Sequence, residues 1–537
     1  MQKSQTTEER GQTAGTRRER RGTVALLSSC MERHAGVSAP GDCMRKFVFF
    51  FLFCILASAP AHSAEDAVSR AMKLFERRHY NEAIVALRAG LPSVEEGRQG
   101  AAYLTLGMIY LKNAELHGEL YRESLSVHLD YLKKIVAAQS KDRSRFVDLY
   151  MGETLLETGK IAPALTYLEK FAADKNVQEK YRAIARTSIG YCHFLQNDKQ
   201  KAEEIWESLD ASDPEIKVAL AAAYSKAGLK DKKPVSLADE GLADLKRSGS
   251  APTIRDIKNI IAVYAATGLS DKGLDLIAHA DLKAFSFRES MSRTKIIYFY
   301  DMSLLNDLSE LYLQAGIASL EKAAQDTKLK ETANFYLGEA YALSGSIDQS
   351  VKATASFMSS PQMPQQYRDK AAARQAANQY QKGRKVDAIG TWDDLVKKHP
   401  ADPDLLAEIL LECDRLKVNC PATLEKAVAS VEAGEGKRFF PLNVAVGKYY
   451  LGRKDYAKAV SYFEAGRDKG NKNKIESNDP LMLVSLAEAY YRTKKFSEAL
   501  EIYFEMSKQF PEVRQIQEAL QGVYAMEHKS AGDVKIF

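Results

Sequence analysis

Few residue sets in this 537-residue sequence have the types and spacing that chemistry at a protein site requires. Residues Gly434 to Lys437 resemble part of a phosphate-binding loop, but no Ser or Thr follows the lysine and no strand pattern precedes the motif. Paired carboxylates such as Glu203 and Glu204 lie in charged helical faces, where solvation explains them. No histidine after residue 64 stands four positions from another: they are His79, His117, His128, His193, His279, His399 and His528. We therefore predict no catalytic residue, no metal site and no cofactor.

Three cysteines follow residue 64, and two of them are close in sequence. Cys413 and Cys420 could form a disulfide in an oxidising compartment if the chain turns back before Pro421. If both lay in one helix, the seven-residue offset would hold them about 10 Å apart, which is too far for a disulfide. The sequence leaves this pairing open. Cys192 is predicted to be a core residue.

The elements that carry these residues are predicted to be helices, because pairs of small residues recur 12 positions apart along most of the chain. A large apolar or aromatic residue often stands three positions after the first small residue, and another stands four positions after the second. Between them comes a turn, often with glycine, as at Gly159, Gly345, Gly383 and Gly452. This pattern predicts two antiparallel helices that approach closely at the small residues. The seven pairs are Ala71/Ala83, Gly152/Ala164, Gly190/Ala202, Gly338/Ser350, Ala376/Ala388, Gly447/Ala459 and Ala487/Ala499.

The pattern resembles the tetratricopeptide repeat family, whose unit is a helix–turn–helix of about 34 residues. The best match lies near the end of the chain, at Leu483, Leu486, Ala487, Tyr490, Phe496, Ala499, Tyr503, Met506 and Pro511. The resemblance covers about residues 66–525 and implies an all-α solenoid of stacked antiparallel helix pairs in a right-handed superhelix. One unit departs from it: after Tyr103, Leu106, Gly107 and Tyr110, about five extra residues precede an expected second helix at Tyr121–Ile135.

Residues 44–64 have the pattern of a secretory signal peptide. Arg45 and Lys46 are followed by an unbroken apolar run of 11 residues from Phe47 to Ala57 and then by small residues. Such a run is about half of the roughly 20 residues that a membrane-spanning helix needs, so we expect no transmembrane helix after signal cleavage. Phe53, directly before Cys54, argues against a lipid anchor. We therefore expect an exported, periplasmic protein.

The predicted organisation follows from these signals. Residues 1–43 are expected to be an unstructured, mis-assigned extension, with translation starting at Met44. Prolines, glycines and changes in repeat quality then divide the chain softly. The predicted segments are the signal peptide at 44–64, an N-terminal repeat block at 65–230, a degenerate helical block at 231–366, a C-terminal repeat block at 367–526 and a tail at 527–537.

Composition and charge exclude several classes of protein. With 45% hydrophobic and 27% charged residues, most of the chain is too apolar to be disordered. The net charge is +5, but residues 1–64 hold nine basic and five acidic residues, so the remainder is nearly neutral. Net charge therefore gives no support for nucleic-acid binding.

The resemblance implies that the first helices of successive repeats line a groove that binds a partner. At the corresponding positions the surface is apolar and aromatic with acidic residues, which suits an apolar segment of a protein or peptide. In a tightly wound superhelix the same side chains would pack on neighbouring repeats instead. The groove candidates are Leu104, Met108, Leu111, Glu153, Tyr191, Phe194, Phe335, Glu339, Glu488, Tyr491 and Arg492.

These observations favour a non-enzymatic, protein-binding scaffold in the periplasm of a Gram-negative-type cell, where the repeats hold a partner during envelope assembly or export. Two alternatives stay open. One is a chaperone-like holdase for secreted chains, which would bind many partners. The other is an accessory subunit of an envelope enzyme, or an unrecognised enzyme. The sequence does not indicate the oligomeric state.

Overall fold

The computed structural model describes residues 66–137, 145–249, 252–279, 298–360, 364–433, 440–467 and 479–508, together with Phe510, Leu520, Gln521 and Tyr524. The predicted extension, the predicted signal peptide and the tail at 527–537 lie outside these residues. In the described part all regular structure is helical. No helix in this part is both long enough and apolar enough to cross a bilayer.

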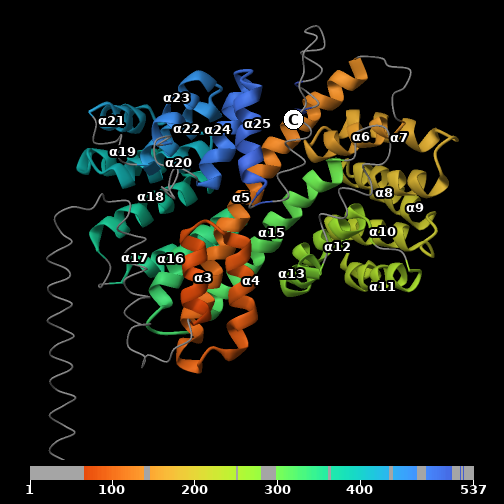
Figure 1. Ribbon diagram of the computed structural model, residues 1–537, viewed down its shortest axis with the longest axis horizontal. Coiled ribbons are helices and arrows are strands. Elements are labelled where there is room, and N and C mark those ends of the chain that lie inside the picture. The colour runs from red at the N-terminus through yellow and green to blue at the C-terminus, as the bar shows by residue number, and fades with distance from the viewer. Residues whose placement is uncertain are drawn as a thin grey trace, which may run out of the picture.

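The helices follow one another as short antiparallel pairs, with two exceptions, α5 and α15 (Figure 1). The first half of the chain contains α3 (Ala67–Glu76), α4 (Tyr80–Gly90), α5 (Glu96–Ala137), α6 (Phe146–Glu157), α7 (Ile161–Ala173), α8 (Glu179–Leu195), α9 (Lys199–Glu207), α10 (Pro214–Lys226), α11 (Pro234–Arg247), α12 (Ile254–Ala266) and α13 (Ser270–His279), with single 3₁₀ turns at Leu91–Ser93 and Lys230–Lys232.

The second half contains α15 (Tyr298–Ala323), α16 (Lys330–Leu343), α17 (Ile347–Met358), α18 (Gln365–Gln381), α19 (Lys385–Lys398), α20 (Pro403–Arg415), α21 (Pro421–Glu432), α22 (Phe440–Gly452), α23 (Tyr456–Gly466), α24 (Pro480–Arg492) and α25 (Phe496–Met506). The chain is therefore an all-α array of stacked helix pairs, as the sequence predicts.

The small-residue pairs mark where the two helices of a pair approach each other. A Cβ added at Gly152 would lie 2.6 Å from Leu168 Cγ, and one at Gly190 would lie 2.4 Å from Trp206 Nε1. At Gly447 the nearest atom would be Phe463 Cε1, at 2.6 Å. In each case the blocking side chain stands four positions after the second small residue. The 12-residue spacing therefore arises because a large side chain of the second helix packs over a glycine of the first helix.

Each of these pairs turns at a residue with a left-handed backbone, seven positions after the first small residue. Glycine occupies this position at Gly159, Gly345 and Gly383, where φ is +72°, +76° and +88°. Asn197, Lys454 and Lys494 take the same conformation elsewhere. The sequence prediction placed the turn of one pair at Gly452, which was wrong: Gly452 is the last residue of α22, and Lys454 has the positive φ of 64°.

The predicted break near Tyr121 does not exist, because α5 continues without interruption for 42 residues. Seven positions after Gly107, where other pairs turn, stands Ala114, a strong helix former that rarely adopts a left-handed conformation. Instead of folding back on its neighbour, α5 pairs with α15, nearly 200 residues later. A Cβ at Gly107 would lie 2.5 Å from Leu320 Cγ, and Ser309 Oγ donates to the Ala114 carbonyl at 2.7 Å, so the two helices run antiparallel.

Two arcs of helix pairs begin and end on this central α5/α15 pair (Figure 1). The N-terminal arc, α6–α13, leaves the end of α5 and returns to α15 through α12 and α13. The C-terminal arc, α16–α25, leaves α15 and returns to α5 through α24. The α3/α4 pair packs on the first half of α5. The largest hydrophobic cluster combines residues of α5, α15 and both arcs, so α5 lies at the centre of the core.

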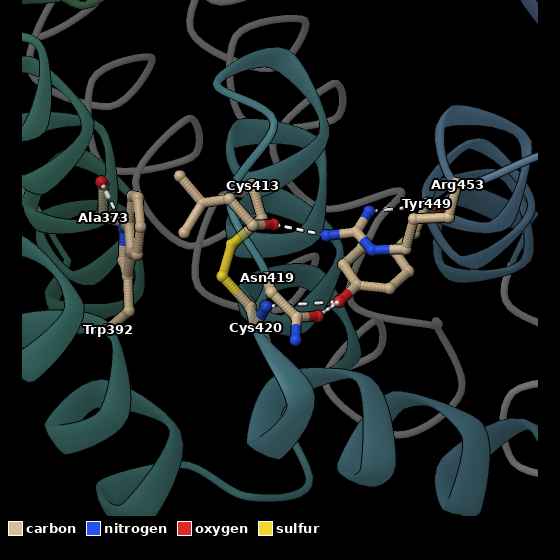
Figure 2. The surroundings of a disulfide bond; sticks show 8 residues. Ala373, Trp392, Cys413, Asn419, Cys420, Tyr449 and Arg453 are labelled. Carbon is tan, nitrogen blue, oxygen red and sulfur yellow. Dashed lines mark hydrogen bonds between the residues drawn. A yellow bond between two sulfur atoms is a disulfide. The ribbon is translucent and has the colours of Figure 1, made fainter.

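The turn between α20 and α21 carries the disulfide that the sequence left open. Cys413 and Cys420 are joined with their Cα atoms 6.4 Å apart, because α20 ends at Arg415 and the chain turns before Pro421 (Figure 2). Tyr449 of α22 donates to Asn419 Oδ1 at 2.6 Å and accepts from the Cys420 amide at 3.2 Å. The disulfide and these bonds fix the turn against α22. Cys192 is buried and unbonded.

Candidate functional site

The inner face of the N-terminal arc contains a hollow of about 60 Å³ between the first helices of four successive pairs. Alanines of α10, at positions 219, 222 and 223, form its floor. Polar and charged side chains of α6, α8, α10 and α12 form its walls: Glu153, Glu157, Thr187, Ser188, Tyr191, Lys226, Arg255, Lys258 and Asn259. We call this surface the α6–α12 groove.

Opposite charges alternate across the α6–α12 groove. The Glu157 carboxylate accepts a hydrogen bond from Tyr121 of α5 at 2.8 Å and lies 3.6 Å from Lys226 Nζ. Lys258 Nζ lies 4.0 Å from the Asp307 carboxylate of α15. The central helix pair therefore holds these charges of the groove in place.

Burial and these neighbours shift the pKa values of the groove residues. Burial raises the pKa of the Asp307 carboxyl to about 6 although Lys258 and Lys226 oppose the shift. Burial and the nearby Lys226 ammonium lower the pKa of Lys258. Burial alone would raise the pKa of Glu157, but Lys226 and Lys258 outweigh it, so the net shift is downward. The groove is thus a set of partly desolvated charges that can form charge-assisted hydrogen bonds.

An aromatic edge borders the same groove. The rings of Tyr191 and Phe194 are stacked with their centroids 6.4 Å apart, and Phe194 also contacts Trp206. Both rings are half-buried, and Leu195 beside them is 45% exposed. This edge offers apolar area with little conformational freedom, which is the kind of surface that anchors a bound protein segment.

The inner face of the C-terminal arc is covered by the chain itself. Lys112 of α5 lies 3.6 Å from Glu339 of α16, and Arg374 of α18 lies 3.4 Å from the same carboxylate. The Arg374 guanidinium also lies 2.9 Å from Glu408 and 4.7 Å from the centroid of the Phe335 ring. An ion-pair ladder therefore connects α5 to the first helices of this arc.

The last pair of the C-terminal arc contacts α5 directly. Tyr491 donates a hydrogen bond to Asp130 at 3.1 Å, and Arg492 donates to Ser126. Lys448 of α22 lies 3.0 Å from Glu119. These residues are 329 to 366 positions apart in sequence and close the arc on α5.

The predicted groove candidates therefore fall into three groups. Leu104, Met108 and Leu111 are buried on α5 and belong to the central core. Phe335, Glu339, Tyr491 and Arg492 contact other helices of the C-terminal arc or α5, and Glu488 pairs with Arg492 within α24. Glu153 and Tyr191 line the α6–α12 groove, with Phe194 at its edge.

Sequence reasoning missed the basic wall of this groove, which consists of Lys226, Arg255 and Lys258, and the neighbouring amide of Asn259. Helices α10 and α12 lie in stretches where no secure pair of small residues marks the register. The turn signal was present, however, because Gly228 and Gly268 have φ of +70° and +74° and follow these helices. Counting back seven positions from each glycine would have assigned α10 and α12 to first helices.

In the part of the chain that the structure describes, no three His, Cys, Asp or Glu side chains are grouped as metal ligands. The α6–α12 groove holds charged, hydroxyl and aromatic groups, whose arrangement suits recognition of another polypeptide.

The chain is similar to solved structures that include the following two. The crystal structure of yeast Tom70 is 12% identical, with 73% of this chain and 96% of that chain covered and a TM-score of 0.29. A structure of the APC/C hetero-tetramer Cut9-Hcn1 is 12% identical, with 88% and 98% covered and a TM-score of 0.27. No curated protein matches the sequence. Residues 445–512, which hold the two most regular pairs, match the model of the tetratricopeptide repeat family. Residues 445–512 therefore consist of tetratricopeptide-type repeats, and the other helix pairs have the same helix–turn–helix form.

Proposed function

We propose that this protein is a non-enzymatic scaffold that holds a partner protein in the α6–α12 groove. The observation that supports this most is the contrast between the two inner faces. The C-terminal face is covered by α5, whereas the α6–α12 groove keeps a hollow bordered by half-buried aromatic rings. Tetratricopeptide repeats are protein-interaction modules, so a protein partner is the expected ligand.

The partner's bound segment is expected to combine apolar and charged groups. Tyr191 and Phe194 offer aromatic anchors. The Glu157 carboxylate offers a hydrogen-bond acceptor, and Lys226 and Lys258 offer donors. A bound segment could place an apolar side chain on the aromatic edge and polar groups over the alanine floor. It would then contact both the aromatic anchors and the charged groups.

We further propose that the protein works in the periplasm, in envelope assembly or export. The signal-peptide pattern at residues 44–64 and the Cys413–Cys420 disulfide are both typical of exported proteins. Cell fractionation combined with mass spectrometry of the mature N-terminus tests this. A cytosolic protein that retains residues 44–64 would contradict it.

The groove is tested with Ser188→Arg, which places a long side chain in the hollow beside the Glu153 and Glu157 carboxylates. The matched control is Ser236→Arg, on the exposed outer face of α11 in the same arc. Crosslinking in cells followed by mass spectrometry should recover one or two defined partners with the wild-type chain and with Ser236→Arg, at least tenfold more than with Ser188→Arg. Recovery of many unrelated chains would favour a holdase. Equal recovery with both variants would refute the groove assignment.

A further inference from the structure

A second and larger hollow lies between the outer faces of α3 and α4, the first helix pair in the part of the chain that the structure describes. Its volume is about 1280 Å³, compared with about 60 Å³ for the α6–α12 groove. It ends where the two helices touch, because a Cβ at Gly90 would lie 2.3 Å from the Ala67 Cβ. We call this surface the α3/α4 groove.

The α3/α4 groove has an apolar floor. Leu74 of α3, with Val85, Ala86 and Ala89 of α4, lines it together with Val94. Val85 is 61% exposed, although Val68, Ala71, Ala83 and Leu87, on the opposite faces of the two helices, are fully buried. An apolar crevice on a solvent-facing side has no role in the packing of this helix pair, and it therefore indicates an interaction surface.

Cations line the α3 side of this crevice. Arg70 and Lys73 of α3 and Arg77, which directly follows α3, lie on one side of it, because they are three and four positions apart. In the part of the chain that the structure describes, Arg70 and Arg77 have no ion pair. Two of the carboxylates that line the groove already have partners, since Asp66 pairs with Arg98 and Glu82 bonds to His79. Arg70 and Arg77 therefore leave the groove with positive charge that an acidic ligand could contact.

The helix pair that carries the groove is held firmly from three directions. Buried Arg78 lies 3.3 Å from Asp479, which precedes α24. Arg88 of α4 lies 2.7 Å from Asp275 of α13, and Asn113 of α5 donates to Asn81 at 3.0 Å. Both arcs and α5 therefore fix the pair, and a rigid, preformed surface loses less entropy when it binds a ligand.

The shape of the groove favours a helix over an extended peptide. The described residues contain no strand whose edge could pair with an extended segment, and the backbone groups of α3 and α4 are already bonded within their helices. An extended peptide in an apolar crevice would leave its own amide groups without partners, whereas a helix satisfies them internally. Helices of 10 and 11 residues offer contact over about 15 Å, or three turns.

We propose that the α3/α4 groove docks an amphipathic helix of a partner protein, with an apolar stripe that lies on Leu74, Val85 and Ala89 and acidic residues that face Arg70 and Arg77. This site is separate from the α6–α12 groove. A protein with both sites brings two polypeptides together on one rigid frame.

Fluorescence anisotropy with two labelled, stapled 14-residue helices tests the proposal on the full chain. Both probes carry leucine at positions 4, 7, 8 and 11, and they differ only in having glutamate or lysine on the flanks. The glutamate probe should bind the wild-type chain at least tenfold more tightly than the lysine probe. Val85→Lys should weaken its binding at least tenfold. Val386→Lys, at an 83% exposed valine of α19, is the matched control and should change binding less than twofold.

A charge reversal makes the test specific. Arg70→Glu combined with Arg77→Glu should weaken the glutamate probe at least tenfold and strengthen the lysine probe. Both arginines are exposed, so circular dichroism should show unchanged melting. Equal binding of the two probes, or binding that Val85→Lys leaves unchanged, would overturn the proposal.

Other occupants give distinct results. If the wild-type chain bound vesicles containing 30% phosphatidylglycerol and Val85→Lys abolished this, the site would be a membrane surface and the helix proposal would fail. A wild-type dimer that Val85→Lys converts to a monomer in sedimentation would mean that a second copy occupies the groove, which also overturns the proposal. Ser188→Arg should leave probe binding unchanged, so failure of this site and failure of the α6–α12 groove are distinguishable.

Discussion

The N-terminal and C-terminal arcs are built from the same repeat, but they meet the central helix differently. The N-terminal arc starts at the end of α5 and finishes on α15, which leaves a hollow between its first helices. The C-terminal arc closes on the middle of α5, where Glu339, Lys448 and Tyr491 all find partners. The inner face of a repeat array can therefore serve as a binding surface or as an internal interface, and the helix that closes the arc decides which.

Disrupting the central pair should have the largest effect, because both arcs depend on it. Gly107→Leu would force a side chain against Leu320 and the Gly316 carbonyl, which a Cβ at position 107 would already approach to 2.5 and 3.3 Å. We expect a loss of about 3 kcal/mol or more in the free energy of unfolding, and loss of hydrogen-exchange protection in both arcs. Gly97→Leu, where a Cβ would meet nothing within 4 Å, is the control. Damage confined to one arc would refute a shared centre.

Removing the disulfide should destabilise only the C-terminal arc. Replacing Cys413 and Cys420 with serine opens a loop whose closure is worth about 2 to 3 kcal/mol in the chain-entropy description. Hydrogen exchange measured by mass spectrometry should then show faster exchange in α20–α22 and unchanged exchange in α6–α12. Equal acceleration in both arcs would mean that they unfold as one unit.

The closure of the C-terminal arc should depend on pH through Glu123 of α5. This side chain is 1% exposed, and its carboxyl oxygens have no hydrogen-bond partner among the described residues. Glu488 and Arg492 of α24 and Glu119 of α5 are the charged groups that influence it. Burial, and then the Glu488 carboxylate, raise the pKa of Glu123 well above its usual value.

The sign follows from linkage. Because the folded state holds this proton more tightly than the unfolded state, the contribution of Glu123 to stability is complete below pH 4 and decreases as pH rises through the folded-state pKa. Glu123→Gln should therefore stabilise the protein at pH 8 more than at pH 5 in urea titrations.

Glu119, one turn earlier on α5, serves as the control because its pKa is shifted in the opposite direction. Burial would raise its pKa, but Lys448 and Arg122 outweigh this and lower it to about 2. Its contribution is therefore present above pH 4.3 and is lost as pH falls toward 2. Glu119→Gln should destabilise at pH 7. The same pH trend for both variants would contradict this account.

The smallest expected effect is the loss of stability on removing a helix cap, and it should be equal in the two arcs. Asp213 and Asp402 cap α10 and α20, and each accepts backbone hydrogen bonds and precedes a proline at the first helical position. Replacing either aspartate with alanine should cost about 1 kcal/mol, as measured by thermal unfolding. A clear difference between the two would show that the arcs differ in local helix stability as well as in closure.

The helix pairs could be predicted from the sequence because each leaves a local trace. The small residues Gly190 and Ala202 indicate that two helices approach closely, and the Trp206 side chain packs against Gly190 where they do. The turn at Lys454 was harder to locate, since a lysine with positive φ resembles any other lysine in a sequence. The pairing of α5 with α15 left no periodic trace, because its partners are nearly 200 residues apart. That pairing places α5 at the centre of the molecule, so it decides which groove candidates are buried and which remain accessible.

Closure also sets the order in which the molecule can be completed. In an open repeat array each new pair packs on the one before it, so the chain can fold as it emerges. Here the hydrogen bond between Asp130 and Tyr491 can form only after 361 further residues have been synthesised. At typical synthesis rates of about 5 to 20 residues per second, one side of α5 stays without its final neighbours for roughly 20 to 70 seconds. During that interval this side of α5 is open to contact with other chains.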